Sequence, residues 1–333
     1  MKKIIKKWGL FSVVLLLSMI MMIGCGAQEQ TMKDKSGAAS NDKTEEAADN
    51  NGKSFPVTIT DDANRKITID KEPETIVSIQ ASNTEIAFAL GLGDKIIGRS
   101  DYDNYPEEAL KIQSVGAQDI NAELVLSLLP DIALVTDYHY KTHPDVLQKF
   151  EEAGIDVIVV GSASSFEDAY RNIEMIGKAT GRKTEADEIV ADMKDRLQDI
   201  KDKAAASVTD KKKVWVEVSP GPDIFTTGKN TFMHEMLESI QAINAAEDQD
   251  GWVKMSEEEI VKLNPDVIIT TYGYYVENPT NEVLSREGWA EVPAVKNGNV
   301  FDVDSDTVTR PGPRLIEGVE TLAELIYPEI FKQ

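Results

Sequence analysis

Residues 184–206 read TEADEIVADMKDRLQDIKDKAAA, the longest helical pattern in the chain that contains neither glycine nor proline. We expect Thr184 to cap this helix, with Glu185 and Asp187 in the first turn, where the helix dipole favours negative charge. At 1.5 Å per residue the helix spans roughly 35 Å, about the width of a small domain, so it predicts a rod that joins two lobes. Its apolar residues recur at steps of three and four, as on one helical face: Ala186, Ile189, Val190, Met193, Leu197, Ile200 and Ala204.

Strands and helices alternate on both sides of the rod. We expect a hairpin of residues 57–60 and 66–69, strands at 75–79, 95–98, 131–135, 156–160, 213–218, 266–270 and 300–303, and helices at 83–90, 123–128, 146–153, 166–180, 231–239, 257–263 and 314–326. Asn83 would cap the first helix. The alternation predicts an α/β fold of two Rossmann-like lobes with mainly parallel sheets, joined by one bridging helix, with a ligand cleft between the lobes.

The lobes are placed at residues 55–181 and 209–333, on either side of a bridging helix at residues 182–208. Residues 123–136 and 258–271 match each other in helix, Pro-Asp corner and strand, which favours two related lobes. The alternative is that Pro-Asp serves many helix-to-strand corners, since proline stops a helix and aspartate suits a turn.

The N-terminus has the pattern of a targeting segment. Four lysines precede an apolar run, Leu10–Ile23, that is shorter than a membrane span and ends at Gly24-Cys25. Residues 1–24 are typical of a bacterial lipoprotein signal peptide, after which Cys25 is lipidated; the alternative is a signal anchor with an incidental cysteine. Residues 25–54 are polar and predict a flexible tether. We therefore expect an extracytoplasmic body anchored to the bacterial cell membrane.

Composition and motifs argue against several classes of function. The net charge of −23 disfavours binding to nucleic acid or to an anionic membrane surface. The chain has three histidines and no G-x-S-x-G, H-E-x-x-H or P-loop motif, so hydrolase, metalloprotease and NTPase hypotheses lack support. His139 and His143 have a metal-ligand spacing, but Pro144 follows and residues 137–144 show no helical stripe, so we expect a surface loop there and no metal.

A binding site has better support. Ligands of parallel sheets collect at the carboxyl ends of strands, and the loops expected there are rich in aromatic residues: Tyr102, Tyr105, Phe225, Trp252, Tyr272, Tyr274 and Tyr275. Flat rings suit a large, flat, mostly neutral ligand, although any one of them could instead pack on its own lobe. Asp306 and Arg310 are spaced to pair with each other on the surface or to bind a ligand's amides.

From residue 57 to residue 331 the chain resembles the substrate-binding lipoproteins of ABC importers for corrinoids, siderophores and haem, whose lobes are joined by a single long helix. Within this class it is most similar to vitamin B12 (cobalamin) binders. The resemblance is carried by SNTEIAFALG (82–91), SDYDNYPEEA (100–109), FTTGK (225–229), GWVKMS (251–256) and SDTVTRPGPR (305–314). Where some cobalamin binders have a tryptophan in the first lobe, this chain has Ala117-Gln118, and Gln241-Ala242 replaces a usual Gly-Gly.

The resemblance implies residue roles. Tyr102 or Tyr105, together with Phe225 and Trp252, would face the corrin, and Asp306 and Arg310 would contact its polar substituents. Glu85 and Glu238, one on the outer surface of each lobe, would dock arginines of the permease; the alternative is a glutamate that serves a helix dipole or a solvated face.

We therefore expect a monomeric importer binding protein, with no catalytic cofactor, that captures cobalamin and delivers it to a permease and its ATPase. A single bridging helix predicts a stiff molecule with modest closure on binding. One alternative is a ferric siderophore, for which Arg99, Lys229, Arg310 and Arg314 would supply positive charge, or haem, with Met255 or a loop tyrosine as axial ligand. A second is a surface hydrolase that uses Asp101, Asp103 and Asp306.

Overall fold

The computed structural model describes residues 55–332, which belong to one compact unit. The predicted signal peptide, Cys25 and the tether lie outside the described residues. None of the helices in the described part of the chain combines the length and the apolar character that a membrane span requires.

The predicted rod is helix α6, Lys183–Ser207. Six of the seven predicted apolar positions are buried, and Ile189 is partly buried against the same core. The predicted cap is wrong, because the helix begins at Lys183 and Thr184 already lies inside its first turn. Arg182 occupies the N-cap position, and its side chain makes no capping hydrogen bond.

The first sheet is parallel, with the strand order β4-β3-β5-β6. Its strands are β3 (Ile76–Ser78), β4 (Ile96–Gly98), β5 (Ile132–Thr136) and β6 (Asp156–Val160), and its helices are α1 (Ala81–Ala89), α2 (Ala122–Leu128), α3 (Asp137–Thr142), α4 (Pro144–Glu152) and α5 (Phe166–Ala179). Alternate residues of β5 and β6 enter two different core clusters, one with α1 and α5 and the other with α2 and α4. Helices therefore cover both faces, as predicted.

The second sheet is also parallel, with the strand order β12-β11-β7-β9. Its strands are β7 (Lys213–Glu217), β9 (Ile243–Asn244), β11 (Val267–Thr270) and β12 (Val300–Asp302). Helices α7 (Phe232–Ser239) and α12 (Leu315–Ile326) contribute to the core on one face, and α8 (Glu257–Leu263), α9 (Pro279–Leu284) and α10 (Pro293–Asn297) to the core on the other.

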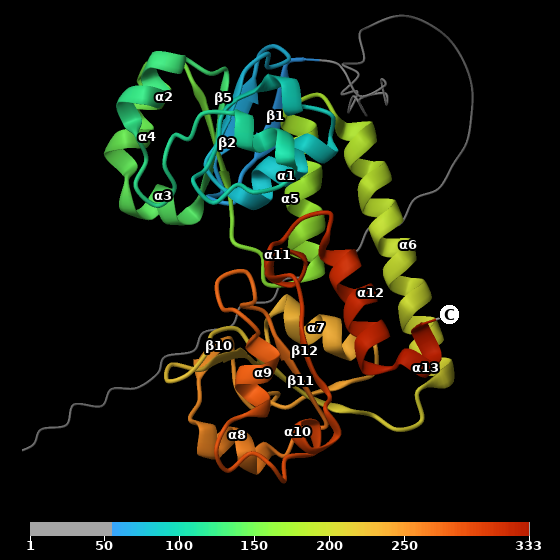
Figure 1. Ribbon diagram of the computed structural model, residues 1–333. Helices are drawn as coiled ribbons and strands as arrows, with labels where there is room; N and C mark the ends of the chain where they lie inside the picture. The colour runs from blue at the N-terminus through green and yellow to red at the C-terminus, as the bar shows by residue number, and fades with distance from the viewer. Residues whose placement is uncertain (1–54, 333) are drawn as a thin grey trace, which may run out of the picture. The chain divides into compact units, whose positions relative to one another are not determined.

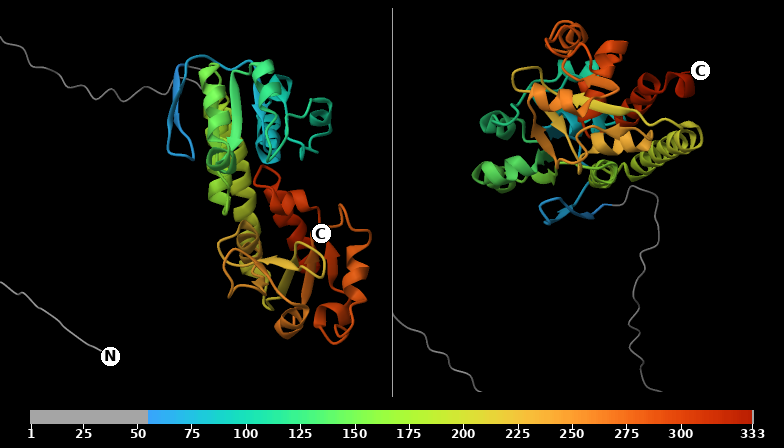
Figure 2. Two further views of the ribbon diagram at one scale, coloured as in Figure 1. Left: turned by 90° about the vertical axis from the view of Figure 1, so that its left-hand side faces the viewer. Right: turned by 90° about the horizontal axis from the view of Figure 1, so that it is seen from below.

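Smaller elements complete the described chain. They are the antiparallel hairpin of β1 (Val57–Thr60) and β2 (Lys66–Ile69), the antiparallel pair of β8 (Phe225–Thr227) and β10 (Trp252–Lys254), two 3-10 turns at Gly93–Lys95 and Glu107–Lys111, and helices α11 (Ser305–Thr309) and α13 (Pro328–Phe331). In Figure 2 the β1–β2 hairpin, coloured blue in the left view, lies next to α5.

One core cluster joins the two sheets. It contains residues from α1, α5, the buried stripe of α6, α7 and α12, together with inward-facing residues of both sheets. Figure 1 shows α6 running beside the elements of both sheets. We call residues 55–182 the N-terminal lobe and residues 208–332 the C-terminal lobe. The predicted division into lobes at residues 55–181 and 209–333, with a bridging segment at residues 182–208, stays a prediction.

Two local predictions were wrong. Residues 137–142 form helix α3 and not a loop, because Thr136 and His139 make a capping box: each side chain binds the backbone N–H of the other. Asn83 lies inside α1 and does not cap it, since the helix begins two residues earlier and its N-cap is Gln80.

The shared core predicts that a cavity in α6 weakens both lobes at once. Leu197 is buried, so Leu197→Ala should lower the free energy of unfolding by about 2–5 kcal/mol in a single denaturant transition followed by circular dichroism. Asp199→Ala, on the exposed face, is the matched control. Two separate transitions, with one unaffected, would contradict a shared core.

Candidate functional site

Two adjoining cavities lie at the carboxyl ends of the strands. The inter-lobe cavity has a volume of about 480 Å³, and its walls are Gln80, Ala81, Tyr102, Asn104, Tyr274, Asp304, Ser305, Asp306, Thr309, Arg310 and Pro311. The N-terminal cavity, of about 370 Å³, is lined by Ile79, Gln80, Tyr102, Ala117, Gln118, Thr136, Asp137, Tyr138, His139 and Ser162. The shared residues Gln80 and Tyr102 show that the two cavities meet. Their position follows the rule for ligand sites in parallel sheets.

A ring of polar contacts crosses the inter-lobe cavity. Arg310 Nη2 lies 2.8 Å from Asp306 Oδ1. From the N-terminal lobe, Asn104 Nδ2 donates to Asp306 Oδ2 at 2.7 Å, and Asn104 Oδ1 accepts from Arg310 Nη1 at 2.8 Å. The predicted polar pair is therefore formed, and it is already joined to the opposite lobe.

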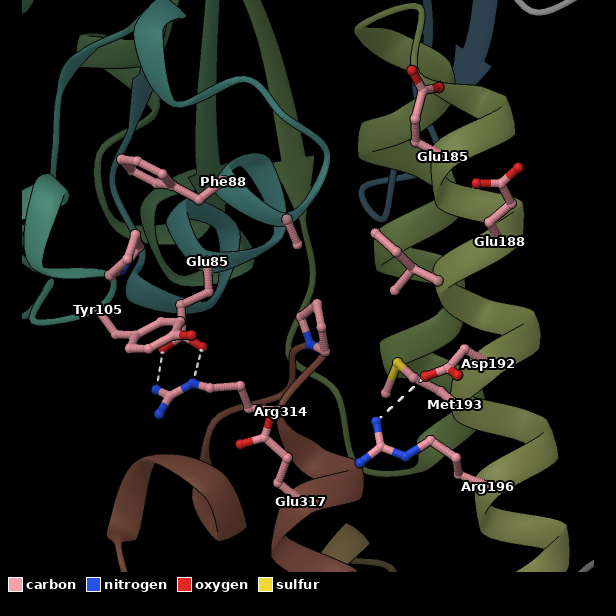
Figure 3. Close-up of a pocket in the computed structure, with 14 residues that line it drawn as sticks. Glu85, Phe88, Tyr105, Glu185, Glu188, Asp192, Met193, Arg196, Arg314 and Glu317 are labelled. Atoms are coloured by element: carbon pink, nitrogen blue, oxygen red, sulfur yellow. Dashed lines mark hydrogen bonds and ion pairs between the residues drawn. The ribbon is translucent and has the colours of Figure 1, made fainter.

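The four aromatic residues expected to face the ligand occupy three places. Tyr102 is 67% exposed and borders both cavities. Tyr105 instead lines a separate cavity, where its ring covers the guanidinium of Arg314 at 3.9 Å (Figure 3). Phe225 and Trp252 are exposed on the β8–β10 pair, where the strand register puts both side chains diagonally on one face. They are not among the residues that line the inter-lobe cavity.

The structure also locates the two predicted docking glutamates. Glu85 is not on an outer surface: it is 4% exposed and paired with Arg310 and Arg314, so that expectation is wrong. Glu238 is exposed at the end of α7, 3.5 Å from His234 Nε2.

The ring of Tyr272 is buried in its own lobe, where its hydroxyl donates to Glu217 at 2.7 Å. Tyr272 is therefore a core residue and not a wall of the ligand site.

His139 is held in one neutral tautomer. Its Nδ1 accepts from the backbone N–H of Thr136 at 3.1 Å, so the proton lies on Nε2, which donates to the carbonyl of Ala117 at 2.7 Å. Burial lowers the pKa of His139, which also favours the neutral ring. Both nitrogens are occupied and neither can bind a metal. Within residues 55–332 no group of three or more His, Cys, Asp or Glu side chains is placed to hold a metal ion.

A buried carboxylate supports the loop that carries Tyr102. Asp103 Oδ2 accepts from the hydroxyl of Thr84 at 2.6 Å and from the N–H of Ser100 at 3.2 Å, while Oδ1 has no partner among the described residues. Burial raises the pKa of Asp103 to about 6, although these hydrogen bonds and the charges of Arg99 and Arg310 oppose the shift.

Several wall residues were missed from the sequence, among them Gln80, Asn104 and Tyr138. Gln80 and Tyr138 lie two residues after the ends of β3 and β5, so the rule that placed the site at strand ends would have found them. Asn104 lies between the two tyrosines of the same loop. Tyr138 borders the N-terminal cavity together with Ala117 and Gln118, the positions at which some cobalamin binders have a tryptophan. The same cavity of this chain therefore has an aromatic ring, supplied by Tyr138.

Comparisons with known proteins agree with this geometry. The profile of a family described as periplasmic binding protein matches residues 76–307. This chain belongs to the periplasmic binding protein family. A Bacillus subtilis (strain 168) protein named "Uncharacterized ABC transporter substrate-binding lipoprotein YvrC" is 48% identical, over 98% of this chain and 99% of that protein.

Two solved structures are informative. A possible iron-binding, periplasmic solute-binding protein of Staphylococcus epidermidis superimposes with a TM-score of 0.69 and 35% identity, over 77% of this chain and all of that one. The periplasmic vitamin B12 binding protein BtuF of Vibrio cholerae gives a TM-score of 0.63 and 26% identity, over 79% of this chain and 99% of that one. These relatives confirm the resemblance and the fold, and they are binding proteins, not enzymes.

The buried carboxylate of this periplasmic binding protein predicts a pH effect. Because the pKa of Asp103 is raised to about 6 in the folded state, its contribution to stability is complete below about pH 4 and is lost as the pH rises through 6. Asp103→Asn should therefore change stability little at pH 4.5 and increase it by up to about 3 kcal/mol at pH 8, measured by urea unfolding. The exposed Asp94→Asn is the control; an equal gain at both pH values would exclude this titration.

Proposed function

We propose that this protein is a lipid-anchored, extracytoplasmic binding protein that captures cobalamin and delivers it to an ABC importer. Its Bacillus subtilis relative is named as a substrate-binding lipoprotein of an ABC transporter, and the similar Vibrio cholerae structure is a vitamin B12 binding protein. The pattern ending at Cys25 supports the lipid anchor. The partners would be a permease and, through it, an ATPase, and the binding protein would act as a monomer.

The observation that carries the choice of cobalamin is the charge of the site. Among the described residues that line the two cavities, Arg310 is the single cation, and the acidic residues are Asp137, Asp304 and Asp306. A ferric catecholate or a haem with two propionates is anionic and would find no unpaired cation among these residues, because Arg310 is already paired with Glu85 and Asp306. A corrinoid surrounded by neutral amides does not need such a charge, and its amides suit carboxylate acceptors and a guanidinium donor.

The predicted site residues are assigned the following roles in this proposal. Tyr102, Phe225 and Trp252 would cover the flat faces of the corrin, since exposed rings bury apolar area with little loss of side-chain entropy. Asp306 and Arg310 would bind its amides. Tyr105 would act indirectly, because it packs on Arg314 behind the cavity.

The alternative ligands have weaker support. Arg99 donates to the carbonyls of Ile112 and Ser100, and Arg314 lines a different cavity, so neither adds free charge to the site. Met255 packs against the core of the C-terminal lobe, and both nitrogens of His139 are engaged. An axial bond to haem iron would fall to Tyr102, Tyr138 or Tyr274, the remaining candidates among these wall residues.

Docking to the permease would use exposed carboxylates that meet arginines of the transporter. Glu238 keeps this role, because it is exposed on α7; buried Glu85 does not. Docking would depend on salt concentration, since exposed ion pairs are screened.

Calorimetric titration tests the ligand class. Cyanocobalamin, a ferric catecholate, a ferric hydroxamate and haem are each titrated into the protein at one ionic strength. We expect cyanocobalamin to bind most tightly, with the anionic chelates weaker because of the charge of the cavity. Tighter binding of haem or of a ferric chelate would reject the cobalamin proposal and leave the importer role intact.

Removal of one ring tests the position of the ligand. Trp252→Ala should weaken cyanocobalamin binding by about 10- to 100-fold, because burying an aromatic side chain contributes about 1.5–3 kcal/mol. Tyr140→Ala, which removes an exposed ring from α3 outside both cavities, is the control and should leave the affinity unchanged. Equal affinity in the two variants would place the ligand away from the β8–β10 pair.

A further inference from the structure

A buried carboxylate of one lobe holds two arginines of the other. Glu85 lies on α1 in the N-terminal lobe, Arg310 is the C-cap residue of α11, and Arg314 is the N-cap residue of α12. Glu85 Oε1 accepts from Arg310 Nη1 at 2.6 Å and from Arg314 Nη2 at 2.7 Å, while Oε2 accepts from Arg314 Nε at 2.9 Å. Figure 3 shows Glu85 and Arg314 facing each other, with the ring of Tyr105 beside them.

This cluster separates two cavities. Arg310 lines the inter-lobe cavity, whereas Glu85, Arg314 and Tyr105 line a rear cavity of about 700 Å³ between α1, α6 and the start of α12. The side chains of Glu85, Arg310 and Arg314 are only 3%, 13% and 12% exposed, so water screens their charges weakly. Glu85 therefore acts electrostatically on the ligand cavity from behind it.

Both terminal nitrogens of the Arg310 guanidinium already contact side chains of the protein. Its Nη1 donates to Glu85 and to Asn104, and its Nη2 pairs with Asp306. The charges of Arg310 and Arg314 are compensated by those of Glu85 and Asp306, and Asp304 lies 3.7 Å from Arg314 as a third carboxylate. A ligand consequently meets Arg310 as a neutralised, oriented group and not as a free cation.

We propose that Glu85 is a positioning and specificity-determining residue of the ligand cavity: it holds Arg310 across the lobes and removes the positive charge that an anionic ligand would require. The inference rests on the proposed function in that the favoured ligand is an uncharged corrinoid. It also replaces the predicted docking role of Glu85 with a role inside the protein.

Glu85→Gln keeps the size of the side chain and one carbonyl acceptor, but it removes one negative charge beside the cavity, so the charge there becomes more positive by one unit. Two charges about 10 Å apart interact by roughly 1–2 kcal/mol at an effective dielectric constant of about 20, which corresponds to about tenfold in affinity. Binding of an anionic ligand should therefore improve by about this factor relative to binding of a neutral one.

A matched pair of ligands measures the effect. Cyanocobalamin and the monocarboxylic acid made by hydrolysing one of its propionamide groups differ by a single negative charge. We expect Glu85→Gln to improve the affinity for the acid about tenfold relative to the affinity for cyanocobalamin. Glu188→Gln is the control, because Glu188 lines the same rear cavity but has no ion pair among residues 55–332 and does not touch either arginine. An unchanged relative affinity in Glu85→Gln, or an equal change in Glu188→Gln, overturns the proposal.

A second variant gives the opposite sign. Arg314→Gln removes one of the two cations, so the affinity for the acid should fall relative to the affinity for cyanocobalamin. Thermal unfolding establishes that each variant is folded before binding is measured. If Glu85→Gln does not fold, the proposal is tested with Arg314→Gln alone. The proposal is overturned if Arg314→Gln leaves the relative affinity for the acid unchanged or increases it.

A measurement without ligand separates this inference from the proposed function. The mature chain with Cys25→Ser has no other cysteine, so Lys149→Cys on α4 and Lys262→Cys on α8, both exposed, accept a pair of spin labels. If the unchanged protein binds no corrinoid, the proposed function fails, and the distance between labels then tests the position of Glu85. A broader distribution in Glu85→Gln than in Glu188→Gln supports the inference, and identical distributions overturn it.

Discussion

The buried stripe of α6 is the constraint on which the rest of the structure depends. Its apolar side chains enter a core cluster that also contains residues of α1 and α5 from one lobe and of α7 and α12 from the other. The inner faces of both lobes pack into this cluster around the helix, and residues from the carboxyl ends of both sheets border the same cavity. Helix formation at one stretch thus determines where a ligand can bind, although no residue of α6 lines the ligand cavities.

The parts of the fold that local pattern controls could be predicted from the sequence. The seven-residue stripe of α6, the alternating hairpin and the apolar strands all appear, because periodicity reports directly on which side is buried. Helix α3 was missed because its stability comes from a capping box and from the contact of His139 with Ala117, 22 residues earlier, and not from an apolar stripe. Position at strand ends likewise indicated the site, since the rule depends on topology alone.

The partners of individual charged side chains could not be predicted from periodicity or from position at strand ends. Glu85 lies 225 and 229 residues from its two partners, and a glutamate on a short helix looks the same in sequence whether it faces water or two arginines. Four cations were candidates for an anionic ligand. Arg99 and Arg314 prove to be engaged by carbonyls or by Glu85, and Arg310 is shared among Glu85, Asn104 and Asp306. The positive charge that a ligand meets at a site therefore depends on which basic residues are already paired, and a count of basic residues in the sequence overestimates that charge.

Contacts between the lobes beside α6 link the stiffness of the molecule to the proposed binding of a ligand. Besides the Glu85 cluster, Glu235 of α7 accepts from the backbone N–H of Phe166 at the start of α5, at 2.8 Å, so a second carboxylate joins the lobes near the same rod. α6 is a continuous helix of 25 residues with no glycine or proline, so the expectation of modest relative motion of the lobes stays a prediction, and such motion would strain or break some of these lateral contacts. Under the proposed function, a ligand that inserted between Asn104 and Asp306 would exchange one set of inter-lobe hydrogen bonds for another. The more deeply buried pairing of Glu85 with Arg314 lies outside that contact and would keep the rear wall of the cavity closed during capture and release.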